Sequence, residues 1–369
     1  MKNVIGIINL VNEIDQLEEL TYNRCIASTP FGGRYRFIDF ILSSFVNSGI
    51  HKVCMFTQKK YRSLMDHVGS GREWDLDRKQ HGLTVLPPLF EESKEENKGD
   101  LHYFYGHRDY FFRSKEEYVI LAKSHMVCNI DFDPILKFHK DHNAQITVIY
   151  KDNKEEQFSL ARPIKMNSDD TLKSIQINQT NVTNDQISME MFLMKKDLFL
   201  DLVETSIASG WKDFIEDAVI KNLDLLNVYG YKFTGHLGII NTVQSYYKNS
   251  MDLLDISTFH TLFHQSHSIY TKTKDEAPAT YKSDTLVSNS LVTNGCIIEG
   301  TVENSILFRG VEVGKGSRLK NCIIMPNSVI QQNVNLENVI LDKHVIVNMD
   351  KEIIGDPNTP YIAEKLKVI

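Results

Sequence analysis

The sequence predicts a two-domain protein in which a doubly wound α/β domain with a mostly parallel sheet precedes a left-handed parallel β-helix. Short apolar runs alternate with segments of helical periodicity as far as about residue 160. After residue 284, aliphatic residues recur at six-residue spacing. At 369 residues the chain is also longer than one ordinary core supports. We expect the α/β domain at 1–260, a linker at 261–283, the β-helix at 284–350 and a tail at 351–369.

The α/β domain is expected to begin with a buried strand, because residues 4–8 form an unbroken apolar run. Gly32 and Gly33 permit a tight turn, and the apolar spacing that follows predicts a helix ending at Gly49. One expected helix, 101–113, has Asp100 as its N-terminal cap. The remaining expected strands are 51–57, 84–86, 118–122, 145–150, 172–177 and 189–194, and the remaining helices are 60–68, one from 133, 211–223 and 242–254. A charged surface loop is expected at 91–98.

The β-helix is predicted by two interleaved series of residues six positions apart. The first series contains Leu307, Val313, Leu319, Ile324, Ile330, Leu336, Leu341 and Val347, and the second contains Val311, Ser317, Ser328, Val334, Val339 and Val345. The five-residue breaks give coils of about 17 residues, with glycines at the corners and asparagines inside. A β-helix of this kind commonly takes part in assembly, because the unpaired strand edges of its first and last coils have to be covered.

Composition favours a soluble cytoplasmic protein. The net charge of −7 argues against nucleic-acid binding. The five cysteines lack paired spacing, which is typical of free thiols in a reducing compartment. We expect no membrane association, because no apolar run approaches the roughly 18 residues of a membrane span. The start of the sequence fits a buried strand better than a signal peptide.

The chain resembles the glucose-1-phosphate adenylyltransferase (ADP-glucose pyrophosphorylase) family of bacterial glycogen biosynthesis. The stretches that carry the resemblance extend from near the first strand into the β-helix: PFGGRYRFIDF, LSSFVNSGI, EWDLDR, YVILAKSH, SYYKNSMDLLD and NSLVTNGCIIEGTVENSILFRGVEVGKGS. The resemblance implies a nucleotidyltransferase-like α/β domain, and it allows each catalytic position of the family to be checked in this sequence.

Five of those positions depart from the family pattern. In the phosphate-binding loop no glycine remains, Gln16 replaces the arginine, and Glu13 and Asp15 would repel a triphosphate. The four other substituted positions are Ile26 for a lysine, Ser124 and Ile239 for the two metal-binding aspartates, and Asn178 for the sugar-phosphate lysine. The family's GTAD and SMG motifs are also altered, to Gly106–Asp109 and Ser188–Glu190. Two-metal chemistry needs both carboxylates, so we expect no catalytic residues and no metal site in this chain.

This pattern resembles the family's non-catalytic, regulatory subunits of GlgD type. It implies that the chain assembles with a catalytic subunit in a hetero-oligomer such as a heterotetramer. Mg²⁺ would be required only by that partner, and this chain would hold no cofactor. The alternative is a weakly active enzyme that makes ADP-glucose from ATP and glucose 1-phosphate. A third interpretation, an acyltransferase acting through the β-helix, would depend on His344, the one histidine in the repeats.

Three arginines near the glycine turn are candidate effector-binding residues. Arg24 and Arg36 match positions that contact anionic effectors in the family, and Arg34 stands where a lysine is usual. Arginine binds phosphate through two parallel hydrogen bonds, so a phosphorylated effector is expected. The alternative is that these arginines pair with Asp39 or nearby glutamates and stiffen the loop.

Overall fold

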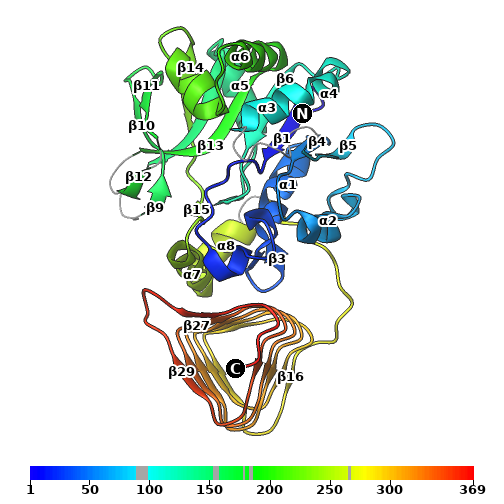
Figure 1. Ribbon diagram of the computed structural model, residues 1–369, viewed down its shortest axis with the longest axis vertical. Helices are drawn as coiled ribbons and strands as arrows, with labels where there is room; N and C mark the ends of the chain where they lie inside the picture. The colour runs from blue at the N-terminus through cyan, green and yellow to red at the C-terminus, as the bar shows by residue number, and fades with distance from the viewer. Residues whose placement is uncertain (89–98, 153–157, 178, 183–185, 265–266) are drawn as a thin grey trace. The chain divides into compact units, whose positions relative to one another are not determined.

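The computed structural model describes residues 1–88, 99–152, 158–177, 179–182, 186–264 and 267–369, and it contains two compact units (Figure 1). Unit 1 comprises Met1–Ile14, Ile38–Ile239 and Ser266–Tyr270. Unit 2 comprises Asp15–Phe37, Ile240–Gln265 and Thr271–Ile369. The charged loop expected at 91–98 lies outside the described residues.

Unit 1 is built on a nine-stranded sheet with the order β11-β10-β13-β6-β1-β4-β5, in which β8 pairs with β13 and β14. Its strands are β1 (Val4–Asn9), β4 (Lys52–Phe56), β5 (Gly82–Leu86), β6 (Tyr118–Ala122), β8 (Ile146–Asp152), β10 (Pro163–Met166), β11 (Leu172–Ile175), β13 (Gln186–Lys195) and β14 (Val228–Lys232). Two small pairs accompany it, β7 (Met126–Val127) with β15 (Gly238–Ile239) and β9 (Phe158–Ala161) with β12 (Gln179–Val182).

The predicted α/β fold class is confirmed. Strands β6, β1, β4 and β5 are parallel, as the alternation of strands and helices indicated. Strand β13, however, runs antiparallel to both β6 and β8, which the sequence analysis did not predict. Because β1 and β6 are parallel neighbours, their carboxyl ends lie side by side. Ligands of α/β proteins usually bind at the carboxyl ends of such strands.

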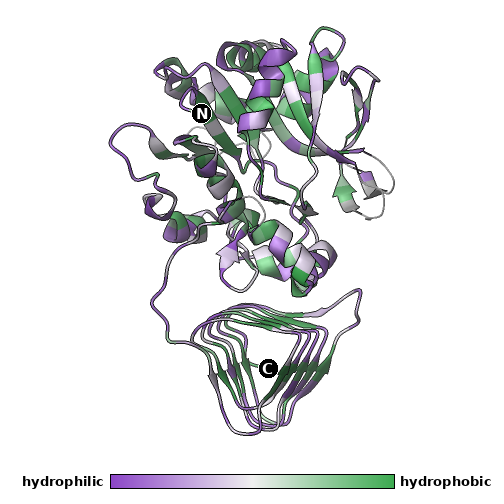
Figure 2. Cartoon of the chain, turned by 180° about the vertical axis from the view of Figure 1, so that it is seen from behind, coloured by the Kyte–Doolittle hydropathy of each residue, from purple (hydrophilic) through white to green (hydrophobic). Residues whose placement is uncertain are grey.

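Helices cover the faces of this sheet (Figure 1). They are α1 (Phe37–Asn47), α2 (Arg62–Val68), α3 (Gly99–Gly106), α4 (Arg108–Phe112), α5 (Asp133–Asp141) and α6 (Lys196–Ala208). Gly6 allows α1 to approach β1 closely, since a Cβ there would lie 2.7 Å from the Phe45 ring. Figure 2 shows hydrophobic residues gathered in the sheet, where the buried side chains of unit 1 form its core.

Two helices expected from the sequence differ in the structure. The helix expected at 101–113 is divided into α3 and α4 at His107. Asp100 does not cap it, because its carboxylate accepts hydrogen bonds from Asn9 Nδ2 and the Phe214 amide instead. The helix expected at 211–223 is a π-helix, Phe214–Val219, followed by a short 3-10 turn, Ile220–Asn222.

Unit 2 contains short α-helical and strand elements together with the β-helix. These elements are the 3-10 turns Glu18–Thr21, Ile26–Ser28 and Asp252–Leu254, strands β2 (Pro30–Phe31) and β3 (Tyr35–Arg36), and helices α7 (Val243–Met251) and α8 (Ile256–Phe263). Gly33 has φ +82°, and a Cβ there would lie 2.6 Å from Leu291 and Thr293. The glycine turn is therefore required both by backbone conformation and by close packing on the first coil.

The β-helix has three parallel five-stranded sheets. The first contains β16 (Thr280–Tyr281), β19 (Ile297–Ile298), β22 (Glu312–Val313), β25 (Val329–Ile330) and β28 (Ile346–Val347). The second contains β17 (Leu286–Ser288), β20 (Thr301–Glu303), β23 (Arg318–Lys320), β26 (Asn335–Glu337) and β29 (Glu352–Ile354). The third contains β18 (Leu291–Val292), β21 (Ile306–Leu307), β24 (Ile323–Ile324), β27 (Val339–Leu341) and β30 (Tyr361–Ala363).

The six-residue pattern correctly predicted the interior of these coils. The aliphatic residues of both series are buried, and successive coils are 17 residues apart at Asn321 and Asn338. Asn304, Asn321 and Asn338 lie at turns directly after β20, β23 and β26, with φ between +45° and +54°, and Asn338 is buried. Strands β29 and β30 continue the sheets beyond residue 350, into the segment expected to be a tail.

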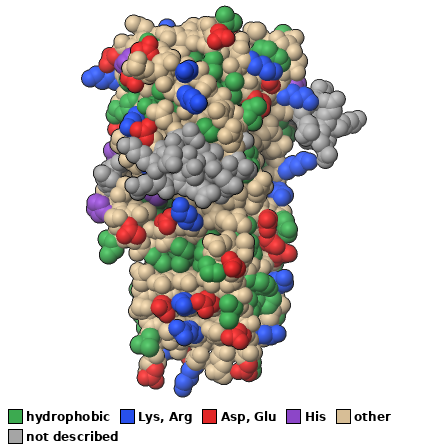
Figure 3. All heavy atoms as spheres, turned by 90° about the vertical axis from the view of Figure 1, so that its left-hand side faces the viewer, with side chains coloured by type: hydrophobic (Ala, Val, Ile, Leu, Met, Phe, Trp, Pro, Cys, Tyr) green, Lys and Arg blue, Asp and Glu red, His purple; other side chains and the backbone are tan. Residues whose placement is uncertain are grey.

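The surface carries mixed charge. On the face drawn in Figure 3, basic and acidic side chains are interspersed without a large patch of one sign. Within the described residues, no helix is both long and apolar enough to cross a membrane.

Candidate functional site

The candidate site lies at the carboxyl ends of β1 and β6 in unit 1. The segment after β1 carries Glu13, and the segment after β6 carries Lys123, Ser124 and His125. Because the two strands are parallel neighbours, their following residues meet at one edge of the sheet. This edge is where the resemblance placed the phosphate loop and one metal aspartate.

Glu13 turns back into the site and binds Ser124. Its Oε1 accepts a hydrogen bond from the Ser124 amide at 2.7 Å and one from Ser124 Oγ at 2.8 Å. The Glu13 side chain is only 4% exposed. Lys123 Nζ donates to the Val11 carbonyl at 2.9 Å, which fixes the segment that carries Glu13. A carboxylate of the chain itself therefore occupies donors at the position where the resemblance places metal and phosphate.

A buried charged network extends from this contact. His125 Nδ1 lies 3.5 Å from Glu13, and His125 Nε2 lies 3.9 Å from Glu190. Arg162 lies 3.6 Å from Glu190 and 3.1 Å from Glu216. Glu190 lies in the irregular stretch of β13 and has φ +51°, a conformation that is unfavourable for most residues other than glycine. It stands where the resemblance places the glycine of the family's SMG motif. The side chain that replaces it is thus directed into the protein, where it is 6% exposed.

The pKa of Glu13 is lowered below its ordinary value. Burial alone would raise the pKa, but the contact with His125, the charge of Lys123 and the Ser124 amide outweigh it. A carboxyl whose pKa is lower in the folded state stabilises the fold above the unfolded pKa, and this stabilisation is lost as pH falls through the folded value.

We therefore expect Glu13→Gln to lower the free energy of unfolding by about 1–3 kcal/mol at pH 7, with a smaller loss below about pH 4. Urea unfolding at both pH values measures the difference. The control is Glu204→Gln, because Glu204 is an exposed residue of α6. Equal losses at the two pH values would contradict the lowered pKa.

The site does not fit a pair of Mg²⁺-binding carboxylates. Ile239, at the second aspartate position, is buried in β15 opposite Met126 of β7. Glu13 is the acid that contacts Ser124, and one of its oxygens is already bonded to the Ser124 amide and hydroxyl. Across the part of the chain that the structure describes, no three His, Cys, Asp or Glu residues are grouped so as to hold a metal ion. No step of a metal-assisted reaction can be assigned to these residues.

The other substituted positions are distributed over the chain. Gln16 and Ile26 belong to unit 2, where Gln16 N donates to the Asn241 carbonyl at 2.8 Å and Ile26 is 2% exposed. Asp15 caps the local turn by accepting from Leu17 N and Thr21 Oγ1. Asn178 lies outside the described residues.

The three candidate effector arginines have different environments, all within unit 2. Arg24 is buried and its Nη2 contacts both oxygens of Asp342, at 2.8 and 2.7 Å. Arg34 is exposed, with its Nη2 2.9 Å from Tyr35 Oη and its guanidinium over the Tyr35 ring. Arg36 lies close enough to Lys343 to lower the pKa of that lysine, which burial first and then Arg36 and Arg24 bring to about 6.

Sequence reasoning missed the internal partners of this site. Glu13 was expected to repel phosphate, but the structure shows it bonded to Ser124, 111 residues away. Glu190 and Arg162 were not predicted as parts of the site, although a glutamate in place of a motif glycine was a visible signal. Asp342 was likewise not considered as a partner of Arg24.

Comparison with known proteins identifies the family. The Nucleotidyl transferase family model matches residues 15–255, and the GlmU-like C-terminal hexapeptide model matches residues 277–361. The glycogen biosynthesis protein GlgD of Bacillus subtilis (strain 168) is 37% identical over 98% of this chain and 96% of its own length. The chain belongs to the glucose-1-phosphate adenylyltransferase family.

Two further relatives show that both GlgD proteins and glucose-1-phosphate adenylyltransferases are similar to this chain. The glycogen biosynthesis protein GlgD of Geobacillus stearothermophilus is 38% identical over 85% of this chain and 82% of its own length. A glucose-1-phosphate adenylyltransferase of Clostridium perfringens (strain SM101 / Type A) is 31% identical over 89% of this chain and 86% of its own length. The family resemblance and the fold class predicted from the sequence are thus confirmed.

Proposed function

We propose that this chain is a non-catalytic, regulatory subunit of glucose-1-phosphate adenylyltransferase in glycogen biosynthesis. The observation that carries the proposal is the pair of hydrogen bonds from Ser124 to the Glu13 carboxylate. A nucleotide phosphate at this position would have to displace a buried carboxylate or share the site with it. Like charges about 4 Å apart cost on the order of 1–4 kcal/mol, depending on screening, so this edge of the sheet disfavours a triphosphate.

The likeness to both GlgD proteins and adenylyltransferases supports a role beside a catalytic chain. A scaffold that keeps the family fold and loses both metal carboxylates is better suited to binding a paralogue than to its own turnover. We propose a hetero-oligomer with a catalytic paralogue, such as a heterotetramer, in the cytoplasm. The cysteines are free thiols, which fits a reducing compartment.

The ends of the β-helix support an assembly role. Tyr281, Leu286 and Val287, on the first coil, are 53%, 66% and 37% exposed. Met349 and Ile354, near the last coil, are each 60% exposed. Parallel coils also leave unpaired strand edges at their ends. We propose that partner subunits cover part of this apolar surface.

The basic residues of unit 2 support binding of a phosphorylated effector. Arg24 is held by Asp342, so we assign it a positioning role. Arg36 supplies positive charge beside Lys343, whose pKa is lowered to about 6 first by burial and then by the charges of Arg36 and Arg24. An anion between Arg36 and Lys343 would restore the charge of Lys343 and gain two charge-assisted contacts.

Replacement of Arg36 tests this effector proposal. Ligand-induced shifts of the melting temperature are measured with a panel of phosphorylated metabolites for the wild type and Arg36→Ala. We expect the shift to fall to less than about half in the variant, since a charge-assisted contact contributes on the order of 1.5–3 kcal/mol. Arg318→Ala serves as a matched control, because Arg318 is an exposed arginine of β23 outside the candidate effector residues. Identical shifts in wild type and Arg36→Ala would reject the proposal.

Pyrophosphate release by the chain alone, and by a mixture with a catalytic glucose-1-phosphate adenylyltransferase, tests the regulatory function. A chain that alone released pyrophosphate from ATP and glucose 1-phosphate in an Mg²⁺-dependent reaction would instead be a weakly active enzyme. No observation of the structure favours the acyltransferase interpretation, because His344 is a corner residue with φ +59° whose amide donates to the Pro326 carbonyl.

A further inference from the structure

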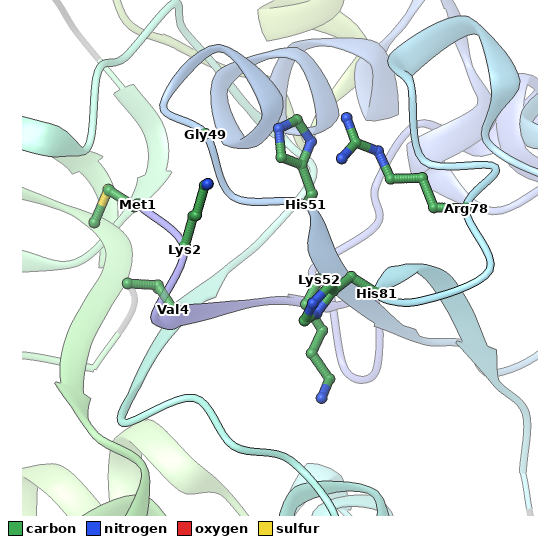
Figure 4. Close-up of a pocket in the computed structure, with 8 residues that line it drawn as sticks. All are labelled: Met1, Lys2, Val4, Gly49, His51, Lys52, Arg78 and His81. Atoms are coloured by element: carbon green, nitrogen blue, oxygen red, sulfur yellow. The ribbon is translucent and has the colours of Figure 1, made fainter.

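A basic pocket opens in unit 1 at the amino ends of the parallel strands (Figure 4). Its volume is about 260 Å³, and it is lined by Met1, Lys2, Val4, Gly49, His51, Lys52, Arg78 and His81. Val4 and Lys52 begin β1 and β4, and His81 directly precedes β5. The six residues of β1 separate this pocket from the Glu13 site by roughly 20 Å, so the pocket belongs to the opposite edge of the sheet.

The side chains that line the pocket include basic residues and no acidic ones. Five of its eight lining residues have basic side chains and none is acidic, in a chain whose net charge is −7. Figure 4 shows His51 between Lys2 and Arg78, with Lys52 directed to the other side. Burial first, and then the positive charge of Arg78, lower the pKa of His51, while Asp75 opposes this and the N-terminal amine and His81 add to it. The positive potential around His51 is therefore only partly compensated.

Nearby carboxylates form ion pairs with some of these basic groups. Glu116 is 2.9 Å from Lys52 and 3.1 Å from His81, Asp75 pairs with Arg78, and Asp133 lies 4.0 Å from the Met1 amine. Among the described residues, the buried His51 Nδ1 has no hydrogen-bond partner, and Lys2 is exposed. In one tautomer of the imidazole this ring nitrogen is a donor, and a buried donor without an acceptor in a concave basic site indicates that an anion completes it.

We propose that this pocket binds the phosphoryl group of a small phosphate monoester, with Lys2, His51 and Arg78 as its ligands. Arg78 is already oriented, because its Nε donates to the Asp75 carbonyl at 2.7 Å. Arginine and lysine at one site suit a phosphate dianion, which offers oxygens to both. The volume of about 260 Å³ is below the range of roughly 300–1,000 Å³ for drug-sized ligands, so it suits a phosphate with a short carbon chain better than a nucleotide.

The probe for the test is inorganic phosphate, titrated calorimetrically into the untagged full-length chain in a chloride buffer of constant ionic strength. The titration is made in the Arg36→Ala background, so that the proposed effector site of unit 2 does not contribute. We expect saturable binding that Lys2→Gln and Arg78→Gln each weaken by about tenfold or more. Matched controls are Lys137→Gln, an exposed lysine of α5, and Arg113→Gln, an arginine 3.9 Å from Asp109.

A second measurement locates the ion independently of folding effects. The ring resonances of His51, assigned with His51→Gln, are expected to shift on addition of phosphate in the parent protein and not in Lys2→Gln. Absence of saturable binding would overturn the proposal, as would unchanged affinity in Lys2→Gln and Arg78→Gln. Either result would leave the regulatory function intact, because that function rests on the opposite edge of the sheet.

Discussion

The chain alone is expected to release pyrophosphate from ATP and glucose 1-phosphate at least about 10³-fold more slowly than a catalytic member of the family. The physical reason is that Ser124 and Ile239 stand where the resemblance places two metal carboxylates, and that the Glu13 carboxylate is bound to Ser124. A coupled assay for pyrophosphate, with and without Mg²⁺, measures this rate. A rate within about tenfold of a catalytic relative would contradict the assignment.

Adding the chain to a catalytic glucose-1-phosphate adenylyltransferase is expected to raise turnover or lower the substrate KM. This follows if the chain binds the active conformation of its partner more tightly than the inactive one, which shifts the population toward activity. The informative titration varies the ratio of the two chains, because a specific complex gives a plateau at a fixed ratio. Kinetics that stay unchanged at every ratio would argue against a regulatory subunit.

Loss of the Arg24–Asp342 pair is expected to have the largest effect on stability. Both side chains are buried, at 3% and 1% exposure, and both Asp342 oxygens contact the same guanidinium nitrogen. Removing one partner of a buried pair leaves an uncompensated charge, at a cost of about 3–5 kcal/mol. We expect Arg24→Met to lower the free energy of unfolding by this amount in urea denaturation.

The double variant Arg24→Met/Asp342→Leu distinguishes the lost charge pair from lost packing. With neither charge buried, the desolvation penalty disappears, and we expect stability to return to within about 1–2 kcal/mol of the wild type. The pair Arg318 and Glu303, whose side chains are 60% and 38% exposed, supplies the control. Arg318→Met should cost less than about 1 kcal/mol, as surface pairs do. Equal losses at Arg24 and Arg318 would contradict the account.

The periodic parts of the fold were predictable because each depends on a local pattern. The β-helix follows from aliphatic residues such as Leu319 and Leu336, and buried runs such as Tyr118–Ala122 identify strands without any knowledge of their neighbours. Strand β13 was expected as a strand, but its antiparallel pairing with β6 and β8 depends on distant segments. The break between α3 and α4 similarly reflects tertiary partners of Asp100.

The assignment of Ser124 and Ile239 to the family's metal-binding positions rests on the resemblance and stays a prediction, whereas the contacts of the site could not be predicted. That Glu13 binds Ser124, and that Asp342 holds Arg24 across 318 residues, requires the folded chain, because no periodicity encodes such a pair. Partners of charged residues in the core are set by three-dimensional proximity and by the cost of leaving a charge unpaired.

A structure determined from crystals soaked in ATP and Mg²⁺ tests the central claim most directly. We predict that the carboxyl edge of β1 and β6 remains as described, with Glu13 still bonded to Ser124 and no ordered triphosphate or metal beside it. Ordered phosphates in that position, with Mg²⁺ between them and a displaced Glu13, would show that the site retains nucleotide binding and would contradict the account.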